Sequence, residues 1–340
     1  MSLKITISDI AKELNTTSAT VSRALSNHKS ISETTKERVR ETALKLNYKR
    51  NNIASSLRTG SSGLIGVIIP SAEINFFGSV VHGIESIANQ NGYNILMYQS
   101  NENYESEKKG IDTFLSARVD GILVSIAKNT TDFSHFLSAK KSNVPIVFFD
   151  RSNDEIGISS VVINDFQGAF VATQHLIDQG YQRIAHISGP KHLKICNDRL
   201  KGYKAALESN KINIDESLIY IGNVSIEAGK EGINHFLSMQ SPPDAVFAVE
   251  DFTALGAIKA LKERKINVPD DFGVIGFANE TFGEHITPTL STIDQQTVQM
   301  GKLAFIQLEK IINNTPELVI EQRVILEPVA IFRQSSQRLT

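Results

Sequence analysis

Residues 6–27 read TISDIAKELNTTSATVSRALSN, and this stretch decides the fold of the N-terminal region. Apolar residues recur at helical spacing on two successive faces: Ile10, Ala11 and Leu14 on the first, Val21 and Leu25 on the second. The spacing predicts two short amphipathic helices. About three residues separate them, which is the spacing of a helix-turn-helix.

Capping residues mark where these helices begin. Thr6 is followed three residues later by Asp9, and Thr17 is followed by Thr20, so each pair can cap a helix N-terminus. A third helix is expected after Ser32, which is a good N-cap residue. Three short helices can together close a small core.

The second helix presents small and polar residues outward. Ser18, Ala19 and Ser22 would let the helix lie deep in a major groove of DNA, and Arg23 could then reach a guanine edge. Any three-helix bundle also exposes small polar residues. The pattern therefore favours DNA binding without establishing it.

Charge is divided unevenly along the chain. Residues 1–60 contain 11 Lys and Arg against 5 Asp and Glu, a net charge of +6. Subtraction from the whole-chain totals of 35 and 37 leaves 24 basic and 32 acidic residues, a net charge of −8. A small basic module is thus joined to a larger acidic one. Nucleic-acid binding would explain this, although a solvated basic face would show the same charge.

Length and composition narrow the class of protein. With 340 residues, of which 41% are hydrophobic and 21% charged, two or three folded units are expected. No apolar run approaches the roughly 20 residues of a membrane span, and the first thirty residues lack the apolar core of a signal peptide. We therefore expect a cytoplasmic protein with no membrane partner. The single cysteine, Cys196, excludes an internal disulfide and a cysteine-rich zinc site.

After residue 63, apolar runs alternate with helical patterns. The runs are LIGVII (64–69), NILMY (94–98), DGILVS (120–125), PIVFF (145–149), VVI (161–163), RIAHIS (183–188), DAVFAV (244–249) and FGVIGF (272–277). This alternation predicts parallel βαβ units in two doubly wound lobes. Ligands of such sheets bind beyond the carboxyl ends of the strands. Polar residues at these ends are Ser71, Asp150, Arg151, Glu250, Asp251 and Asn279.

Taken together, these motifs resemble the LacI/GalR family of bacterial transcription regulators. The N-terminal likeness rests on the 6–27 stretch, ISETTKERV, Tyr48 and NNIASSLRTG. The remainder rests on NFFGSVVHGIE, RVDGILV, VFFDRS, HLIDQGYQRIAHISGP, RLKGYKAAL, AVFAVEDFTALGAIKAL, VPDDFGVIGF and IFRQSS, in the family's order. The resemblance implies an all-α helix-turn-helix headpiece followed by an α/β sensor of the type I periplasmic-binding-protein fold, with two doubly wound parallel-sheet subdomains.

The resemblance also implies domain limits. The headpiece would span 1–50, a hinge helix and linker 51–62, and an effector-binding and dimerisation domain 63–340. Within that domain the N-subdomain would comprise about 63–161 and 294–322, and the C-subdomain about 162–293 and 323–340. Three chain crossings would form the hinge between the subdomains.

Roles in DNA binding follow from the same resemblance. Ser18, Ala19 and Arg23 would read bases. The other residues expected at the DNA are Thr6, Thr17, Thr20, Ser22, Asn27, Ser32 and Asn51, most of them on phosphates. Asn15 stands where the family usually has Gly, and Asn tolerates the positive φ that the turn requires.

A hinge helix over 51–58 would form on DNA. Leu57 would push into the minor groove at the operator centre, with Ala54 facing the groove beside it. A helix this short is unstable by itself, so its folding can be made conditional on dimer geometry.

For the cleft, the resemblance implies that Phe77 lines the ligand, Asp150 and Arg151 lie at the floor, and Arg199 anchors it. Guanidinium forks bind hydroxyl pairs, carboxylates and phosphates with directed bonds. Gln295 is a weaker candidate, and Ser71, Glu250 and Asn279 complete the predicted set. Glu250, Ala278 and Val224 depart from the common sugar-binding pattern, in which Asn, Asp and an aromatic residue are frequent. The added carboxylate of Glu250 favours a neutral or polyhydroxylated effector, a sugar or a related metabolite.

No catalytic motif is present, and His186 lies on an expected buried strand with no nucleophile beside it. We therefore expect a regulator without a cofactor or metal, rather than an enzyme. A transport-type solute-binding protein would share the sensor fold but would need a signal peptide and would lack the basic headpiece. A homodimer on pseudo-palindromic operator DNA is expected, and a tetramer stays open, as does the choice between induction and corepression.

Overall fold

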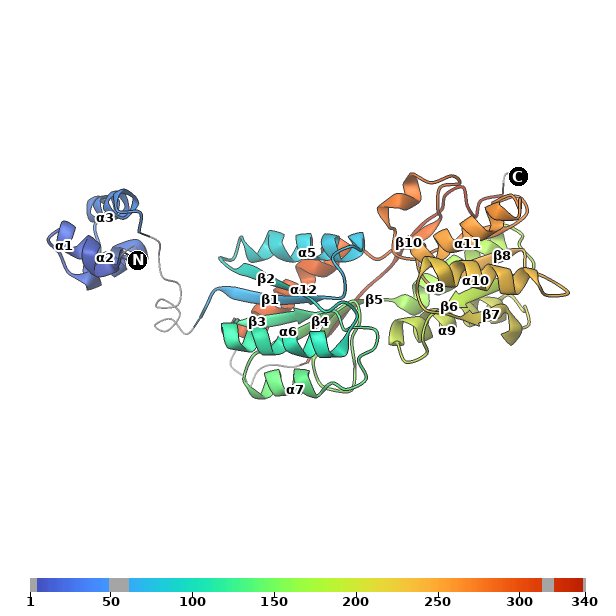
Figure 1. Cartoon of the computed structure of the whole chain (residues 1–340), viewed down its shortest axis with the longest axis horizontal. Coiled ribbons are helices and arrows are strands. Elements are labelled where there is room, and N and C mark those ends of the chain that lie inside the picture. The colour runs from blue at the N-terminus through green and yellow to red at the C-terminus, as the bar shows by residue number, and fades with distance from the viewer. Residues whose placement is uncertain (1–4, 49–60, 314–320, 339–340) are drawn as a thin grey trace. The chain divides into compact units, whose positions relative to one another are not determined.

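The computed structural model describes residues 5–48, 61–313 and 321–338. The chain divides into two compact units, Met1–Ser62 and Gly63–Thr340, which we call the headpiece and the sensor (Figure 1). The predicted hinge helix, with Asn51, Ala54 and Leu57, lies outside the described residues.

The headpiece contains three helices around one small core. They are α1 (Ile7–Glu13), α2 (Ser18–Leu25) and α3 (Glu33–Lys45). The buried core consists of Ile10, Ala11, Val21, Ala24, Val39 and Ala43. These positions recur at helical spacing, so each helix buries one face against the other two.

Local hydrogen bonds fix where the headpiece helices begin. Asp9 accepts from the backbone N–H of Thr6 at 2.8 Å, while the hydroxyls of Thr17 and Ser32 accept from the third residue after each. These are the three capping residues expected from the sequence. Asn15, in the turn between α1 and α2, has φ 52°, as expected for a residue standing in place of glycine.

The first lobe of the sensor is built on a six-stranded parallel sheet in the order β11-β5-β4-β3-β1-β2. Its strands are β1 (Leu64–Ile69), β2 (Asn94–Gln99), β3 (Gly121–Val124), β4 (Ile146–Phe149), β5 (Ser159–Ile163) and β11 (Arg323–Leu326). Its helices are α5 (Asn75–Ala88), α6 (Tyr104–Ala117), α7 (Ser134–Lys141) and α12 (Thr297–Asn313). Separate clusters place α5 and α12 on one face of the sheet and α6 and α7 on the other (Figure 1).

The second lobe is built on a four-stranded parallel sheet in the order β7-β6-β8-β9. Its strands are β6 (Ile184–Ser188), β7 (Ile219–Ile221), β8 (Ala245–Ala248) and β9 (Gly273–Ile275), and β10 (Thr292–Asp294) pairs antiparallel with β12 (Val329–Ile331). Its helices are α8 (Asp165–Asp178), α9 (Lys194–Ser209), α10 (Ile226–Leu237) and α11 (Asp251–Glu263), with short 3-10 helices η1 (Glu216–Leu218) and η2 (Thr281–Glu284). Both lobes are therefore doubly wound, as expected from the alternating pattern.

The limits of the lobes differ slightly from those expected. The resemblance places the end of the first part of the N-subdomain at about 161 and assigns about 323–340 to the C-subdomain. In the structure β11 pairs in register with β5 from Arg323 to Leu326, so residues 323–326 and the end of β5 belong to the first lobe, while β12 pairs with β10. Pairing with a distant strand decides this membership, and the local apolar pattern does not contain that information.

Candidate DNA-binding surface and effector cleft

The outward face of α2 carries the predicted base-reading residues. Ser18, Ala19 and Arg23 are all exposed, while Val21 and Ala24 on the opposite face are buried in the headpiece core. The Ser18 hydroxyl lies 3.3 Å from that of Ser8 on α1. One helix therefore presents two small side chains and one long cation together, as a helix that enters a major groove requires.

Three other predicted DNA contacts lie at helix N-termini. Thr6, Thr17 and Ser32 are the N-cap residues of α1, α2 and α3, and all three are exposed. Helix N-termini attract anions because their first N–H groups lack partners within the helix and the helix dipole is positive there. The caps are thus well placed to face phosphates.

The remaining headpiece candidates lie close to these positions. Thr20 and Ser22 on α2 are half-buried, and the Thr20 hydroxyl lies 3.0 Å from that of Thr17. Asn27 is exposed, has φ 55°, and accepts a hydrogen bond from Arg40 Nη2 at 3.3 Å. The structure thus gathers all the described headpiece candidates around α2 and the helix N-termini.

In the sensor, the Arg199 side chain is buried and is bonded to other groups of the protein. It is 3% exposed, and its Nε donates to Asp165 at 2.8 Å. Its Nη1 donates to the Val249 carbonyl at 2.7 Å, its Nη2 reaches Gln295 Oε1 at 3.5 Å, and its guanidinium lies 3.7 Å from the ring centroid of Phe277. The predicted anchor and the predicted Gln295 are thus brought together.

Asp165, which the sequence analysis missed, balances the charge of Arg199. Burial raises the pKa of Asp165 to about 6, and the attraction of Arg199 opposes that rise. Asp165 is the first residue of α8, and nothing at that position distinguishes it from an ordinary acidic residue at the start of a helix.

Asp150 and Arg151 also have protein partners. Asp150 has φ 60° and accepts from the Ser125 hydroxyl at 3.0 Å, and burial raises the pKa of its carboxyl. Arg151 Nη1 donates to both oxygens of Glu102, at 2.8 and 3.0 Å. Its guanidinium carbon lies 6.0 Å from the ring centroid of Phe77, which is buried. Glu102 was likewise not expected from the sequence.

The side chains of Glu250 and Asn279 form hydrogen bonds with nearby groups of the protein. The Glu250 carboxylate caps α11, accepting from the N–H groups of Phe252 at 2.9 Å and Thr253 at 2.7 Å. Asn279 donates to Asp294 at 2.8 Å and accepts from Arg333 Nη2 at 3.1 Å. The carboxylate expected to repel anions therefore has a structural role as well.

Asp251 and Ser71 are the two remaining polar residues that were predicted at strand ends. Asp251 is fully buried, and this burial raises the pKa of its carboxyl to about 7. Ser71, in the first lobe, is half-buried, and its hydroxyl accepts from the N–H of Glu73 at 3.2 Å. Ser71 is therefore engaged in a local turn.

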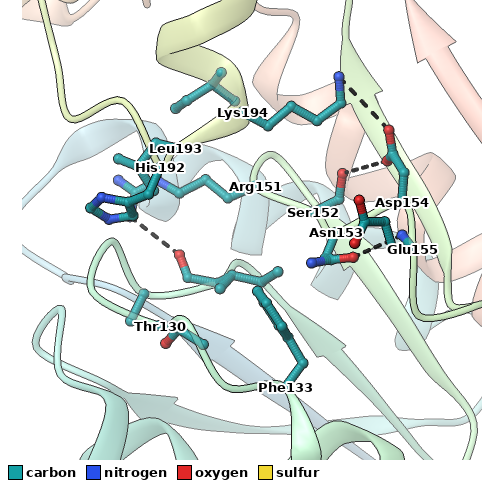
Figure 2. Close-up of a pocket in the computed structure, with 13 residues that line it drawn as sticks. Thr130, Phe133, Arg151, Ser152, Asn153, Asp154, Glu155, His192, Leu193 and Lys194 are labelled. Carbon is teal, nitrogen blue, oxygen red and sulfur yellow. Dashed lines mark hydrogen bonds and ion pairs between the residues drawn. The ribbon is translucent and has the colours of Figure 1, made fainter.

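A cavity of about 260 Å³ lies between the two lobes (Figure 2). Its lining residues are Ile126, Ala127, Thr130, Phe133, Arg151, Ser152, Asn153, Asp154, Glu155, His192, Leu193, Lys194 and Ile195. Among the predicted effector residues, Arg151 lines it. Contacts across the lobes border it: Lys194 lies 3.7 Å from Asp154, and His192 bonds to the Lys128 carbonyl. The volume is slightly below the range of small-molecule sites, roughly 300–1,000 Å³.

His186, the histidine considered as a catalytic residue, is packed inside the second lobe. His186 is fully buried, hydrogen-bonds to the Phe247 carbonyl at 2.9 Å, and has a pKa lowered to about 4 by burial. Within 5–48, 61–313 and 321–338, no group of three or more His, Cys, Asp or Glu is arranged to hold a metal ion. No helix in the described part of the chain has both the length and the apolarity needed to cross a bilayer.

A helix-turn-helix with an exposed reading face, joined to a two-lobed sensor, defines a ligand-responsive DNA-binding regulator. Residues 6–51 match the family model of bacterial regulatory proteins, lacI family, and residues 173–336 match the periplasmic binding protein-like domain. The chain belongs to the LacI family, and it is a transcription regulator rather than an enzyme.

The similarity to known relatives and to a solved structure extends over most of the chain. Catabolite control protein A of Priestia megaterium is 33% identical over 337 residues, covering 98% of this chain and 100% of that protein. The HTH-type transcriptional repressor PurR of Vibrio atlanticus is 32% identical over 307 residues, covering 90% and 92%. The crystal structure of the lac repressor dimer bound to operator and the anti-inducer ONPF has a TM-score of 0.86 at 25% identity, covering 99% and 100%.

Proposed function

We propose that the protein is a repressor that binds a pseudo-palindromic operator as a homodimer. The observation that carries this is the exposed face of α2, where Ser18, Ala19 and Arg23 stand together. The N-caps of the three headpiece helices, Thr6, Thr17 and Ser32, would contact phosphates on either side. Two copies related by a two-fold axis would place two such faces in successive major grooves.

The proposed hinge over 51–62 would connect DNA binding to the sensor. Folding of the 51–58 helices, with Leu57 at the operator centre and Ala54 beside it, would depend on the separation of the two first lobes in the dimer. We further propose that the headpiece unit consists of a DNA-binding part, 1–50, and a hinge and linker, 51–62, which precede the sensor, 63–340. Because the operator lies on the chromosome, the protein would work in the cytoplasm.

The effector would bind between the lobes, beside the cavity that Arg151 lines, with Phe77, Asp150 and Arg199 as further proposed contacts. We infer a neutral, polyhydroxylated molecule, a sugar or a related metabolite. The charge balance supports this: Asp165 offsets Arg199 at 2.8 Å, and Glu102 offsets Arg151 at 2.8 Å. Glu250 adds a further carboxylate. An anion would therefore find no net positive charge to bind.

A ligand screen with the full chain tests this effector class. Operator affinity and thermal unfolding would be measured with neutral sugars and polyols, with sugar phosphates, and with nucleobases. A neutral polyol should both stabilise the sensor and change operator affinity, because only a ligand that prefers one lobe arrangement can shift it. Binding of phosphorylated sugars alone would overturn the class, and the sign of the change would decide between induction and corepression.

A further inference from the structure

A carboxylate of the second lobe caps a helix of the first lobe. Helix α5 follows Ile74, whose side chain cannot accept a hydrogen bond, and no side-chain cap comes from that residue. The backbone N–H of Phe76, in the first turn of α5, instead donates to Glu280 Oε1 at 3.1 Å. Glu280 follows β9 of the second lobe by a few residues, so the cap crosses the cleft.

Glu280 is itself fixed firmly to its own lobe. Its backbone N–H donates to Asp251 Oδ2 at 2.7 Å, and Asp251 Oδ1 accepts from the Thr292 hydroxyl at 2.7 Å. Asp251 is the first residue of α11, and Thr292 begins β10. A continuous series of hydrogen bonds therefore connects the N-terminus of α5 in one lobe to α11 and β10 in the other.

The link lies beside residues of the proposed effector site. Phe76 precedes Phe77, and Glu280 follows Asn279, so each end of the bond is one residue away from a proposed ligand contact. Glu280 is 4% exposed, so water does not readily replace it at the helix end. A carboxylate at a helix N-terminus is also attracted by the helix dipole.

We propose that Glu280 is a positioning residue for the effector response, because it holds α5 to the second lobe and loses its bond when the lobes separate. This rests on the proposed function, in which an effector changes the arrangement of the lobes. Opening of the cleft then leaves the first turn of α5 without its cap. The cap is made in the arrangement of the lobes described above. A ligand that holds this arrangement would therefore protect the first turn of α5, and a ligand that opens the cleft would release it.

Hydrogen exchange of the full-length protein without ligand tests this link. In Glu280→Ala, amides in the first turn of α5 should exchange about tenfold faster than in the unchanged protein, the factor for loss of a side-chain cap. Glu280→Gln keeps an acceptor oxygen and should restore much of the protection. Exchange near Ala88, at the far end of α5, should stay the same in both variants and so shows that the lobe remains folded.

Glu284→Ala is the matched control. Glu284 lies in the adjacent 3-10 helix η2 and pairs with Arg333 Nη2 at 2.6 Å, without a bond to α5. Its loss should leave α5 exchange unchanged. Equal exchange in Glu280→Ala and the unchanged protein, or an equal rise in Glu284→Ala, would overturn the proposal.

Operator binding by the same proteins separates the two proposals. Should the unchanged protein fail to bind any operator, the proposed function fails while the exchange result on the link stands. Should it bind and respond to an effector, Glu280→Ala should weaken that response and Glu284→Ala should not. An identical response in both variants would show that the link does not serve the effector response.

Discussion

The headpiece and the effector cleft hold their functional residues in opposite ways. On α2, Ser18, Ala19 and Arg23 are exposed, so DNA can contact them without rearrangement of the core. In the cleft, Arg199 and Asp150 are buried and already bonded to Asp165 and Ser125. A change on α2 should therefore alter recognition alone, whereas a change in the cleft should also alter the stability of the sensor.

The largest effect is expected from Arg199→Ala. The substitution would leave Asp165 buried without its partner, so the sensor should lose about 3–5 kcal/mol of unfolding free energy. Denaturant unfolding of the full chain measures this. Arg183→Ala serves as the control, because the side chains of Arg183 and its partner Asp215 are 35% and 38% exposed, each more than a third. That surface pair should contribute at most about 1 kcal/mol.

If Arg199→Ala were as stable as the unchanged protein, a change in the cleft would leave stability unaltered, as a change on α2 should. The internal pairing of Arg199 with Asp165 would then contribute little to the fold. Such a result would remove the contrast between the two regions.

Acid should affect the sensor through His186. Burial lowers its pKa to about 4 from an ordinary value of 6.5. Between these values the unfolded chain binds a proton that the folded sensor does not, so its contribution to stability is complete above pH 6.5 and is lost as pH falls toward 4. The loss should amount to about 3 kcal/mol.

Unfolding free energies measured from pH 7 to pH 4 check this expectation. In His186→Phe, which keeps an aromatic ring between Tyr203 and Phe247, the curve should be flatter over this range. The slope is the decisive quantity, because the lost bond to the Phe247 carbonyl shifts the whole curve. An unchanged slope would show that His186 does not titrate as its burial requires.

A smaller effect, confined to recognition, is expected from Arg23→Ala. Discrimination between the operator and its variants should fall by about 1–3 kcal/mol, because Arg23 would no longer reach a guanine edge. Headpiece stability should not change, since the side chain is exposed. Substitution of Lys49 should instead weaken binding to all DNA alike and reduce its salt dependence. Equal losses on operator and random DNA for Arg23→Ala would contradict its reading role.

The two regions also differ in how well the sequence predicts them. The helices, caps and turn of the headpiece follow from local spacing, and Asn15 adopts the expected positive φ. Most strands of the sensor follow from apolar runs. The strands β7, β10, β11 and β12 were not predicted, because each has only three or four residues, and β7, β11 and β12 include exposed positions.

The internal partners in the cleft could not be predicted from local pattern. Arg199 and Asp165 are 34 positions apart in the sequence, Arg151 and Glu102 are 49 apart, and Phe76 and Glu280 are 204 apart. Such contacts depend on how the sheets bring distant loops together. The resemblance to a family predicted a set of cleft residues but not the groups to which they are bonded.

Selection of binding sites from random double-stranded DNA by the purified full chain tests the central claim most directly. The account predicts enrichment of a single pseudo-palindromic sequence, and relaxed selection at symmetric positions in both half-sites for Arg23→Ala. Enrichment of no common sequence, or of an asymmetric site that Arg23→Ala leaves unchanged, would contradict it.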